Sequence, residues 1–296
     1  MNTKGQYGAM VEMIASLCIV GTIGVFRRLI PLPSALIAFF RGLIGSAMLL
    51  VLLLATGKLR GGTVGRRKRL WLLLSGAMIG ANWILLFEAF TYTTIPRATL
   101  TYYLQPTIVL LLSPLVFRER LTMRTLLCAA VSLAGMVLVS GVIGGADAGT
   151  DNLKGIAFSL GAAFLYAMVV ISNKLLGVVE PYRKTLYQLA GSAATLLPHL
   201  LLTGEFSGVD ITPRTALLLL LVGTVHTGLA YLLYIGSMNS LSARTISFLG
   251  YIDPVVAMLS SWLVLGEKMS ALGILGAVMI LGAAIAGESG TASREN

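Results

Sequence analysis

Five ionisable side chains interrupt long apolar stretches of this sequence, and they are the residues best placed to do chemistry. They are Glu12, Arg41, Glu88, His226 and Asp253. If these stretches span a membrane, a charge at their centre costs about 2.5–3.5 kcal/mol on insertion scales, so each side chain needs a partner or a function. A carboxylate there can accept a proton or bind an amine, and an arginine can bind a carboxylate.

Each of these residues also has a purely structural interpretation. Glu12 lies near the start of the first apolar stretch and can extend its carboxylate to the membrane interface. A lone membrane histidine such as His226 is usually held by hydrogen bonds. For Arg41 we favour a structural ion pair, with an acid such as Glu88, over contact with a substrate carboxylate. Glu88 itself is open between an ion pair and a role as proton acceptor or amine partner.

Aromatic and polar side chains suited to a small solute occur on several of the same stretches. Rings offer flat apolar contact area and attract cations, while hydroxyl and amide groups fix the orientation of a solute. Taken singly, each such residue is more often part of the packing than of a binding site. The candidate solute-binding residues are Asn82, Trp83, Phe87, Glu88, Tyr102, Tyr103, Gln105, Tyr166, His226, Tyr231, Ser247, Tyr251 and Asp253.

Two prolines, Pro106 and Pro254, lie in the middle of apolar stretches and predict a kink in each. A proline has no backbone N–H and frees the carbonyl four residues earlier, here that of Tyr102 and that of Gly250. In a membrane these carbonyls must be satisfied by neighbouring groups or by water in a cavity. The two kinks therefore suit a gate beside a wet cavity, although a static packing kink is the alternative.

The elements that carry these residues are predicted to be transmembrane helices. Of the 296 residues, 56% are hydrophobic and only 11% are charged, and the mean hydropathy is +0.88. A soluble domain carries about 25% charged residues, so the bilayer must be the solvent for most of this chain. Ten stretches are long enough to span it: residues 7–26, 33–56, 71–92, 97–117, 123–143, 155–175, 184–203, 214–236, 244–265 and 270–287.

The net charge of +10 reflects membrane orientation rather than nucleic-acid binding, which we do not expect because no nucleic-acid-binding motif accompanies the charge. With ten helices, both termini lie on the same side. The segments on that side hold 15 basic residues, the opposite segments hold six, and Arg41 lies within a helix. Since cytoplasmic loops collect Lys and Arg, we expect both termini in the cytoplasm and the protein in the plasma (inner) membrane.

An internal repeat relates the two halves at an offset of 148 residues. YYLQPTIVLLLSPLVFRERLT, from Tyr102, aligns with GYIDPVVAMLSSWLVLGEKMS, from Gly250, so that Pro106 matches Pro254. Tyr103 and Tyr251 match in the same register, as do Glu119 and Glu267. Because each half has an odd number of helices, the halves must insert in opposite orientations. The sequence thus predicts an all-α membrane protein of two inverted five-helix repeats, 1–146 and 147–296.

This pattern resembles the drug/metabolite transporter superfamily, and within it the EamA-type branch of amino-acid and metabolite exporters. Residues 82–122 carry the first copy of the resemblance and residues 243–270 the second. The resemblance implies a solute cavity lined by helices 1, 3, 4, 6, 8 and 9, with the fifth and tenth helices outside it. One departure is Arg118, where many relatives have a glycine before the loop acid, as the second copy has.

We therefore expect a secondary transporter of small organic solutes working by alternating access. The leading substrates are amino acids or similar zwitterions, moved outward and coupled to protons through Glu88 or Asp253. Two alternatives are an importer of organic cations such as choline-like amines, and a structural or sensory membrane subunit without a transport cycle. The sequence has no phosphate-binding loop, H-E-x-x-H or G-x-S-x-G motif, so we expect no ATP drive, enzyme activity, metal or cofactor.

Small residues predict close helix contacts in two places. Gly76 and Gly80 form a G-x-x-x-G pattern, and the last apolar stretch carries Gly273, Gly276 and Gly282. Such glycines let helix backbones approach closely, within one chain or between two. The pattern leaves both a monomer and a homodimer open, with solute and membrane lipid as the expected partners.

Overall fold

The chain is helical throughout the part that the computed structural model describes, residues 3–57, 64–93, 95–119, 121–139, 152–207, 209–266 and 270–292. No strand occurs among these residues. A helix satisfies its own backbone N–H and C=O groups, which is what an apolar environment requires. The all-α prediction is therefore confirmed. Of the two matched loop acids, Glu119 is described, whereas Glu267 lies outside the described residues.

Several of the apolar stretches are built from shorter helical segments joined end to end. In chain order the segments are α1 (Thr3–Gly21), α2 (Ile23–Leu29), α3 (Ser34–Ala55), α4 (Arg66–Tyr92), α5 (Ile95–Tyr102), α6 (Gln105–Phe117), α7 (Met123–Val139), α8 (Asn152–Leu175), α9 (Pro181–Thr203), α10 (Pro213–Leu221), the π-helix η1 (Val222–Leu229), α11 (Ala230–Ser237), α12 (Ala243–Gly250), α13 (Ile252–Leu265) and α14 (Ala271–Ala292).

Seven helical stretches of the described chain are long and apolar enough to cross a membrane, and α7 and α14 contribute shorter apolar helices. Helix α9 has the length of a span, but Lys184, Thr185 and Gln188 lower its hydropathy. These three side chains are fully buried within the protein. The count of ten spans stays a prediction. The seven stretches are Gly5–Leu29, Ser34–Ala55, Arg66–Tyr92, Ala98–Phe117, Leu153–Leu175, Pro213–Ser237 and Ala243–Leu265.

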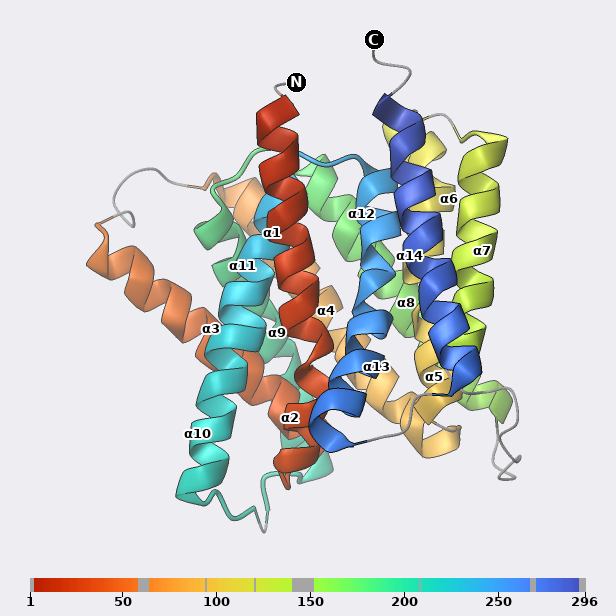
Figure 1. The fold of residues 1–296 in the computed structure, drawn as a ribbon. Helices are drawn as coiled ribbons and strands as arrows, with labels where there is room; N and C mark the ends of the chain where they lie inside the picture. The colour runs from red at the N-terminus through yellow and green to blue at the C-terminus, as the bar shows by residue number, and fades with distance from the viewer. Residues whose placement is uncertain are drawn as a thin grey trace.

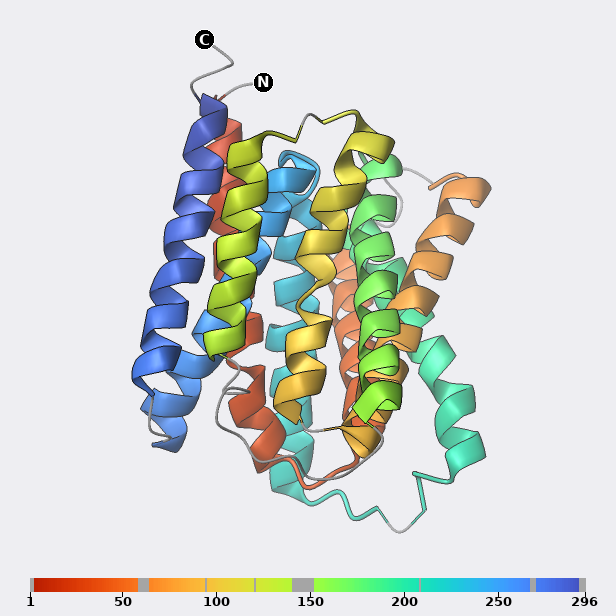
Figure 2. The same cartoon turned by 90° about the vertical axis from the view of Figure 1, so that its right-hand side faces the viewer.

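The helices form one bundle (Figure 1). The start of α1 and the end of α14 lie at the same end of the bundle, as an even number of crossings predicts (Figures 1 and 2). Helices α7 and α14 pack against each other along one edge. This is the peripheral place that the resemblance implies for the fifth and tenth helices, and it leaves the other segments to surround the centre.

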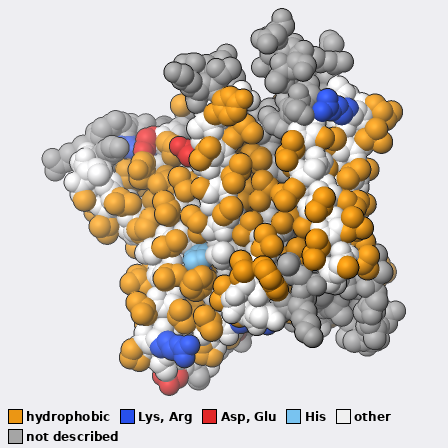
Figure 3. Space-filling view, viewed as in Figure 1, with side chains coloured by type: hydrophobic (Ala, Val, Ile, Leu, Met, Phe, Trp, Pro, Cys, Tyr) orange, Lys and Arg blue, Asp and Glu red, His pale blue; other side chains and the backbone are white. Residues whose placement is uncertain are grey.

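The outside of the bundle is apolar, as expected for a surface that faces lipid. Figure 3 shows hydrophobic side chains covering the middle of one face, with Lys, Arg, Asp and Glu gathered towards its two ends. Large apolar side chains are strongly exposed, including Leu115 at 81% and Leu202 at 89%. An apolar surface of this extent marks contact with a membrane rather than with water. The protein is therefore a multi-pass membrane protein.

Glycines allow two pairs of helices to cross at very short range. A side chain at Gly76 or Gly80 on α4 would overlap the α9 backbone at Gln188 and at Ser192, respectively. At the bundle edge, a side chain at Gly276 on α14 would overlap the backbone of α7. Close packing is therefore confirmed at these predicted glycines. Gly282 differs, because a Cβ there would have no neighbour within 4 Å.

Candidate solute-binding site

Two interrupted helices cross at the centre of the bundle. The helical path breaks at Tyr103, between α5 and α6, and again at Tyr251, between α12 and α13. Each break comes three residues before a proline, where the missing N–H of Pro106 or Pro254 predicts a kink. Helix α6 packs against α12, so the two breaks lie close together. Their role as gates stays a prediction.

Tyrosine hydroxyls link the two breaks reciprocally. Tyr103 donates a hydrogen bond of 2.9 Å to the Asp253 carboxylate in the first turn of α13. Tyr251 is hydrogen-bonded through its hydroxyl to Thr107 in the first turn of α6. These contacts place one carboxylate and several hydroxyl groups where the broken helices meet. Broken helices of this kind form the solute sites of many secondary transporters.

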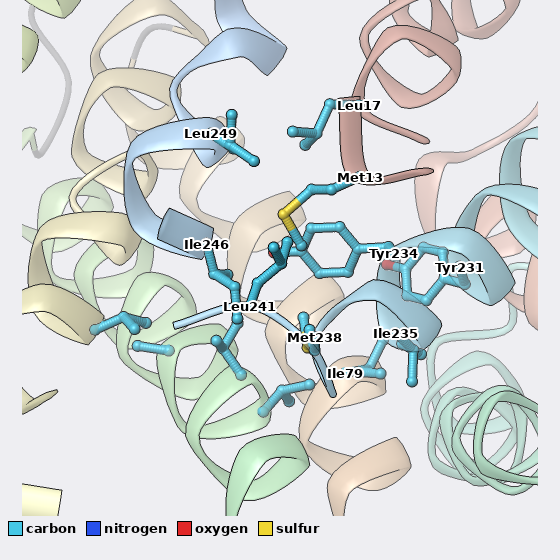
Figure 4. Packing of buried hydrophobic residues seen from close by; sticks show 14 of the residues in the cluster. Met13, Leu17, Ile79, Tyr231, Tyr234, Ile235, Met238, Leu241, Ile246 and Leu249 are labelled. Carbon is cyan, nitrogen blue, oxygen red and sulfur yellow. The ribbon is translucent and has the colours of Figure 1, made fainter. Parts of the chain in front are cut away.

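Five rings gather beside this crossing and are called here the aromatic cluster: Trp83, Tyr102, Tyr166, Tyr231 and Tyr234. Tyr166 lies between Tyr102 and Tyr234, with ring centroids 6.3 and 6.4 Å away, and Trp83 meets Tyr231 edge-on at 6.4 Å. Helices α4, α5, α8 and α11 supply these rings. Figure 4 shows Tyr231 and Tyr234 side by side among buried apolar residues. The cluster thus unites segments from both halves of the chain.

Arg41 of α3 reaches the aromatic cluster. Its guanidinium carbon lies 5.2 Å from the centre of the Trp83 ring, and its Nε donates a 3.0 Å hydrogen bond to the Thr227 hydroxyl. Its charge also acts on Tyr231, Tyr102 and Tyr166. No ion pair of Arg41 occurs within the described chain, so the favoured pairing with an acid such as Glu88 is wrong.

His226 lies apart from the aromatic cluster in its bonding. Its Nε2 and the Thr22 hydroxyl are 3.0 Å apart, and its ring packs on Phe26 at 4.5 Å. Thr22 marks the break between α1 and α2, so His226 ties η1 to this third interruption. The Nδ1 atom is buried without a partner among the described groups. The structural interpretation of His226, a hydrogen-bonded membrane histidine, accounts for one of its two nitrogens.

Other predicted site residues divide between the centre and its surroundings. Asn82 is fully buried beside Tyr102 and donates a 2.6 Å hydrogen bond to the Ala162 carbonyl. Ser247 is occupied within its own helix, because its hydroxyl donates to the Ala243 carbonyl. The Gln105 side-chain oxygen is buried and has no partner in the described structure.

Phe87 lies at the edge of the centre, whereas Glu88 is not brought into the aromatic cluster. Phe87 packs against Phe90, against apolar residues around Leu36 and against the buried core that contains Trp83, Tyr231 and Tyr234. The Glu88 side chain is partly exposed and forms no hydrogen bond or ion pair within the described chain. Among the described residues, no group of three or more His, Cys, Asp or Glu side chains could hold a metal ion.

The structure adds residues that the sequence did not single out for the site. Tyr234 follows Tyr231 by three residues, a spacing that places both rings on one side of a helix, so this signal could have been found. Thr107 and Thr227 had no distinguishing signal, because hydroxyl residues are common in membrane helices. The position of Arg41 deep within an apolar stretch was a signal in the sequence, but the sequence could not identify the partners of its side chain.

A second polar network lies at the end of the bundle that holds the termini. Glu119 accepts hydrogen bonds from the backbone N–H groups of Ala243 at 3.0 Å and Arg244 at 3.3 Å, at the start of α12. Lys184 is fully buried and donates to the Asn173 carbonyl at 2.8 Å, while Lys174 donates to the Leu241 carbonyl. Glu119 therefore joins the α6–α7 loop to α12. The two lysines join α8 to α9 and to the segment just before α12.

Comparison with known proteins identifies related transporters. A family model described as the EamA-like transporter family matches residues 6–141 and 153–286. The chain is 30% identical over 280 residues to "Uncharacterized transporter YxxF" of Bacillus subtilis, which covers 95% of this chain and 89% of the relative. It is 26% identical to "Pseudopaline exporter CntI" of Pseudomonas aeruginosa, covering 94% of this chain and 95% of the relative.

Two further comparisons concern a second named relative and a solved structure. "Probable amino-acid metabolite efflux pump" of Salmonella typhimurium is 28% identical over 62% of this chain and 64% of the relative. A crystal structure superposes with a TM-score of 0.82 at 21% identity, covering 95% of this chain and 98% of that chain. At this identity the likeness shows a shared fold.

Proposed function

Because the chain belongs to the EamA-like transporter family, we propose that it exports amino acids or similar small zwitterions as a secondary transporter working by alternating access. One observation carries this proposal. Two interrupted helices cross at the centre of the bundle, where Asp253 lies at one of the helix breaks and Arg41 contacts the aromatic cluster beside them. A solute held there would contact both halves of the chain, so its binding is coupled to their relative motion.

The proposal includes ten membrane helices in two inverted repeats, 1–146 and 147–296. Contacts between helices support it, because a contact in one repeat has a matching contact when the two repeats are exchanged. The contact of α4 with α9 corresponds to that of α3 with η1, and the contact of α4 with α8 corresponds to that of α1 with α11. The contact of α1 with α13 corresponds to that of α8 with α6. Helices α3 and α7 contact their own counterparts, α9 and α14, and α6 contacts α12, which belongs to the second interrupted helix. Two separately matched family ranges also support two repeats.

The proposed orientation places both termini in the cytoplasm and the bundle in the plasma membrane. The distribution of basic residues supports it, since 15 of 22 fall on the side of the termini. Reporter tags fused after residues 120 and 268 test both orientation and inversion. We expect the first tag in the cytoplasm and the second outside. Tags that report the same side would contradict the inverted repeat.

Zwitterionic substrates fit the charges at the centre and the names of two relatives. A cation binds a tyrosine-rich surface and a carboxylate, while a carboxylate needs a donor such as a guanidinium. One relative is named as an amino-acid metabolite efflux pump and another as a pseudopaline exporter, which supports outward transport. Proton coupling is proposed through Asp253, which is linked to the helix breaks, or through Glu88, which has no partner among the described residues.

A second candidate is an importer of organic cations, and the aromatic cluster is the observation that favours it. Four tyrosines and a tryptophan beside the helix break that carries Asp253 resemble the sites that hold quaternary amines. The positive charge of Arg41 in the same cluster opposes a simple cation and favours a solute that also carries an anionic group.

Solute flux in sealed proteoliposomes tests the function. Vesicles loaded with a labelled panel of L-amino acids, choline and small amines are compared with protein-free vesicles, with and without a pH gradient. We expect faster release of at least one amino acid and a further increase when a proton gradient is imposed. Movement of choline alone would favour the cation importer, and movement of no solute in the panel would contradict a transport function.

A further inference from the structure

Arg41 is the most unusual charge in the bundle because it lies deep in α3 without an acidic partner among the described residues. Arg41 is the eighth residue of α3, well inside a helix whose other side chains are almost all apolar. An arginine at such a depth is normally paired with an acid or placed at a functional pathway. Within the described chain, Arg41 forms no ion pair, and its hydrogen bond goes to a neutral hydroxyl, that of Thr227.

The free part of the guanidinium faces neutral groups. A guanidinium has five N–H donors, and the Nε bond to Thr227 uses one of them. No hydrogen bond of the two terminal nitrogens to a described residue is formed, and the side chain is only partly buried. The neighbours on which its charge acts are Tyr231, Tyr102 and Tyr166, together with the imidazole of His226. Neither a tyrosine hydroxyl nor an imidazole can neutralise a cation as a carboxylate would.

Thr227 and Trp83 hold the guanidinium in a defined orientation. The Thr227 hydroxyl, which accepts from Arg41, donates in turn to the Val222 carbonyl at 3.1 Å. This second bond spans five residues within the π-helix η1, a helix type that is often found at functional sites. The Trp83 ring lies 5.2 Å away as a cation–π partner. The guanidinium is thus fixed at Nε, while its terminal nitrogens remain available.

Asp253 is the complementary charge at the same cluster. Its carboxylate accepts one hydrogen bond, from Tyr103, whose ring is 5.9 Å from that of Tyr102. Both Arg41 and Asp253 act on Tyr102 and Tyr231, yet no ion pair joins them among the described residues. A positive and a negative group that share aromatic neighbours without meeting leave each charge able to bind an opposite group of a solute.

We infer that Arg41 binds the carboxylate of the transported solute and that it thereby selects carboxylate-bearing solutes over simple amines. The inference rests on the proposed transport function and adds its specificity-determining residue. The guanidinium matches a carboxylate with two parallel N–H···O bonds, a geometry that a lysine ammonium does not reproduce. The amino group of the same solute binds towards Asp253 and the aromatic cluster.

The test compares solutes that differ only in their carboxylate. Labelled L-phenylalanine and L-leucine are transported into proteoliposomes in competition with their methyl esters and with phenethylamine and isoamylamine, which lack the carboxylate. The proteins are wild type, Arg41→Gln, Arg41→Lys and the matched control Arg66→Gln, which alters an exposed arginine at the start of α4. Size-exclusion profiles establish that each variant is folded.

We expect the amino acids to compete at least tenfold better than their esters and amines in wild type and in Arg66→Gln. In Arg41→Gln this preference disappears, because amino-acid transport falls while the weak effect of the amines is unchanged. Arg41→Lys restores only part of the preference. If Arg41→Gln fails to fold, the wild-type preference and the Arg41→Lys result decide instead.

Two other results would overturn the inference in distinguishable ways. If wild type transports amino acids but does not prefer a carboxylate, or if Arg41→Gln keeps the preference, Arg41 is not the carboxylate site and the transport function stands. If wild type moves neither the amino acids nor the amines, the proposed function fails and the inference fails with it.

Discussion

At the scale of the residue, the two charges at the centre are held differently, and this separates their roles. Arg41 is fixed through Nε by Thr227, and its terminal nitrogens remain available. Asp253 is the only acid bonded at the helix crossing among the described residues, through the Tyr103 hydroxyl. A carboxylate at the point where two interrupted helices meet can bind an amine or a proton, and the proposed transport cycle would require its release in the opposite state.

Asp253→Asn tests this role with little change in shape. The amide oxygen of the asparagine still accepts the hydrogen bond from Tyr103, so we expect a folded protein, while the negative charge is lost. Amino-acid flux should fall by at least about tenfold, equivalent to about 1.4 kcal/mol, and the remaining flux should no longer respond to a pH gradient. Proteoliposome flux at several imposed gradients measures both effects.

Glu88→Gln is the matched control for this experiment, since it neutralises a membrane carboxylate outside the aromatic cluster. We expect it to keep the response to the pH gradient. If Glu88→Gln loses that response and Asp253→Asn retains it, the proton is carried by Glu88 and the assignment to Asp253 is wrong.

At the scale of the element, backbone contact between helices fixes the positions of the site residues. Gly76 of α4 lies directly against the α9 backbone at Gln188, two turns before Trp83 on the same helix. Gln188 in turn donates hydrogen bonds to Ser75 at 2.7 Å and to Asn173 at 3.1 Å, which join α9 to α4 and α8. A shift of α4 would therefore move Asn82 and Trp83 together.

Gly76→Ala should destabilise the protein, because the added methyl group would overlap the backbone of α9. Overpacking of this kind typically costs about 1–3 kcal/mol. Gly282→Ala is the control, since a Cβ there meets nothing within 4 Å and alanine favours the helix. Thermal unfolding in detergent should show a lower Tm for Gly76→Ala alone. Equal Tm values would contradict the close contact between α4 and α9.

Glu119 connects the two halves at the end of the bundle that holds the termini, because its carboxylate caps α12 from the α6–α7 loop. Loss of a helix cap costs about 0.5–2 kcal/mol, so Glu119→Ala should favour separation of these elements and raise access to the centre from this end. Access can be measured by thiol labelling of a cysteine placed at Tyr234.

Glu180→Ala is the matched control for the Glu119 prediction. Glu180 also accepts a backbone hydrogen bond, from Arg183 at 3.1 Å, but it caps its own helix α9. We expect a similar small change in Tm for both variants and a change in access for Glu119→Ala alone. Equal access in the two variants would remove Glu119 as a contact that closes this end.

At the scale of the whole molecule, the sequence could predict much of the fold and part of the site. Apolar stretches of membrane length predict helices directly, and Pro106 and Pro254 predict the two breaks because proline cannot donate its hydrogen bond. The offset of 148 residues also matches Tyr103 with Tyr251, which the structure places at the two breaks. Such local signals depend on residue type and spacing alone.

The remaining features depend on contacts between distant segments and could not be predicted. Arg41 lies 47 residues from Glu88 in the sequence, yet its bond goes to Thr227, which is 186 residues away. The π-helix η1 leaves no period in the sequence that separates it from an α-helix. The polar residues Lys184 and Gln188 lower the hydropathy of α9, and nothing in the sequence indicates that both are fully buried inside the protein.

The most direct test of alternating access is the accessibility of the central site from each side of the membrane. The two natural cysteines, Cys18 and Cys128, are replaced by serine, and a single cysteine is introduced at Tyr234 in a variant that retains flux. Leu115→Cys, which alters an exposed side chain on the apolar outside of the bundle, is the control that we expect to remain unlabelled.

Sealed vesicles of both orientations are treated with a membrane-impermeant thiol reagent, with and without a transported amino acid. We expect that the cysteine at position 234 is labelled from both sides and that the amino acid changes the ratio of the two labelling rates. Labelling from one side alone under every condition would contradict alternating access around this site.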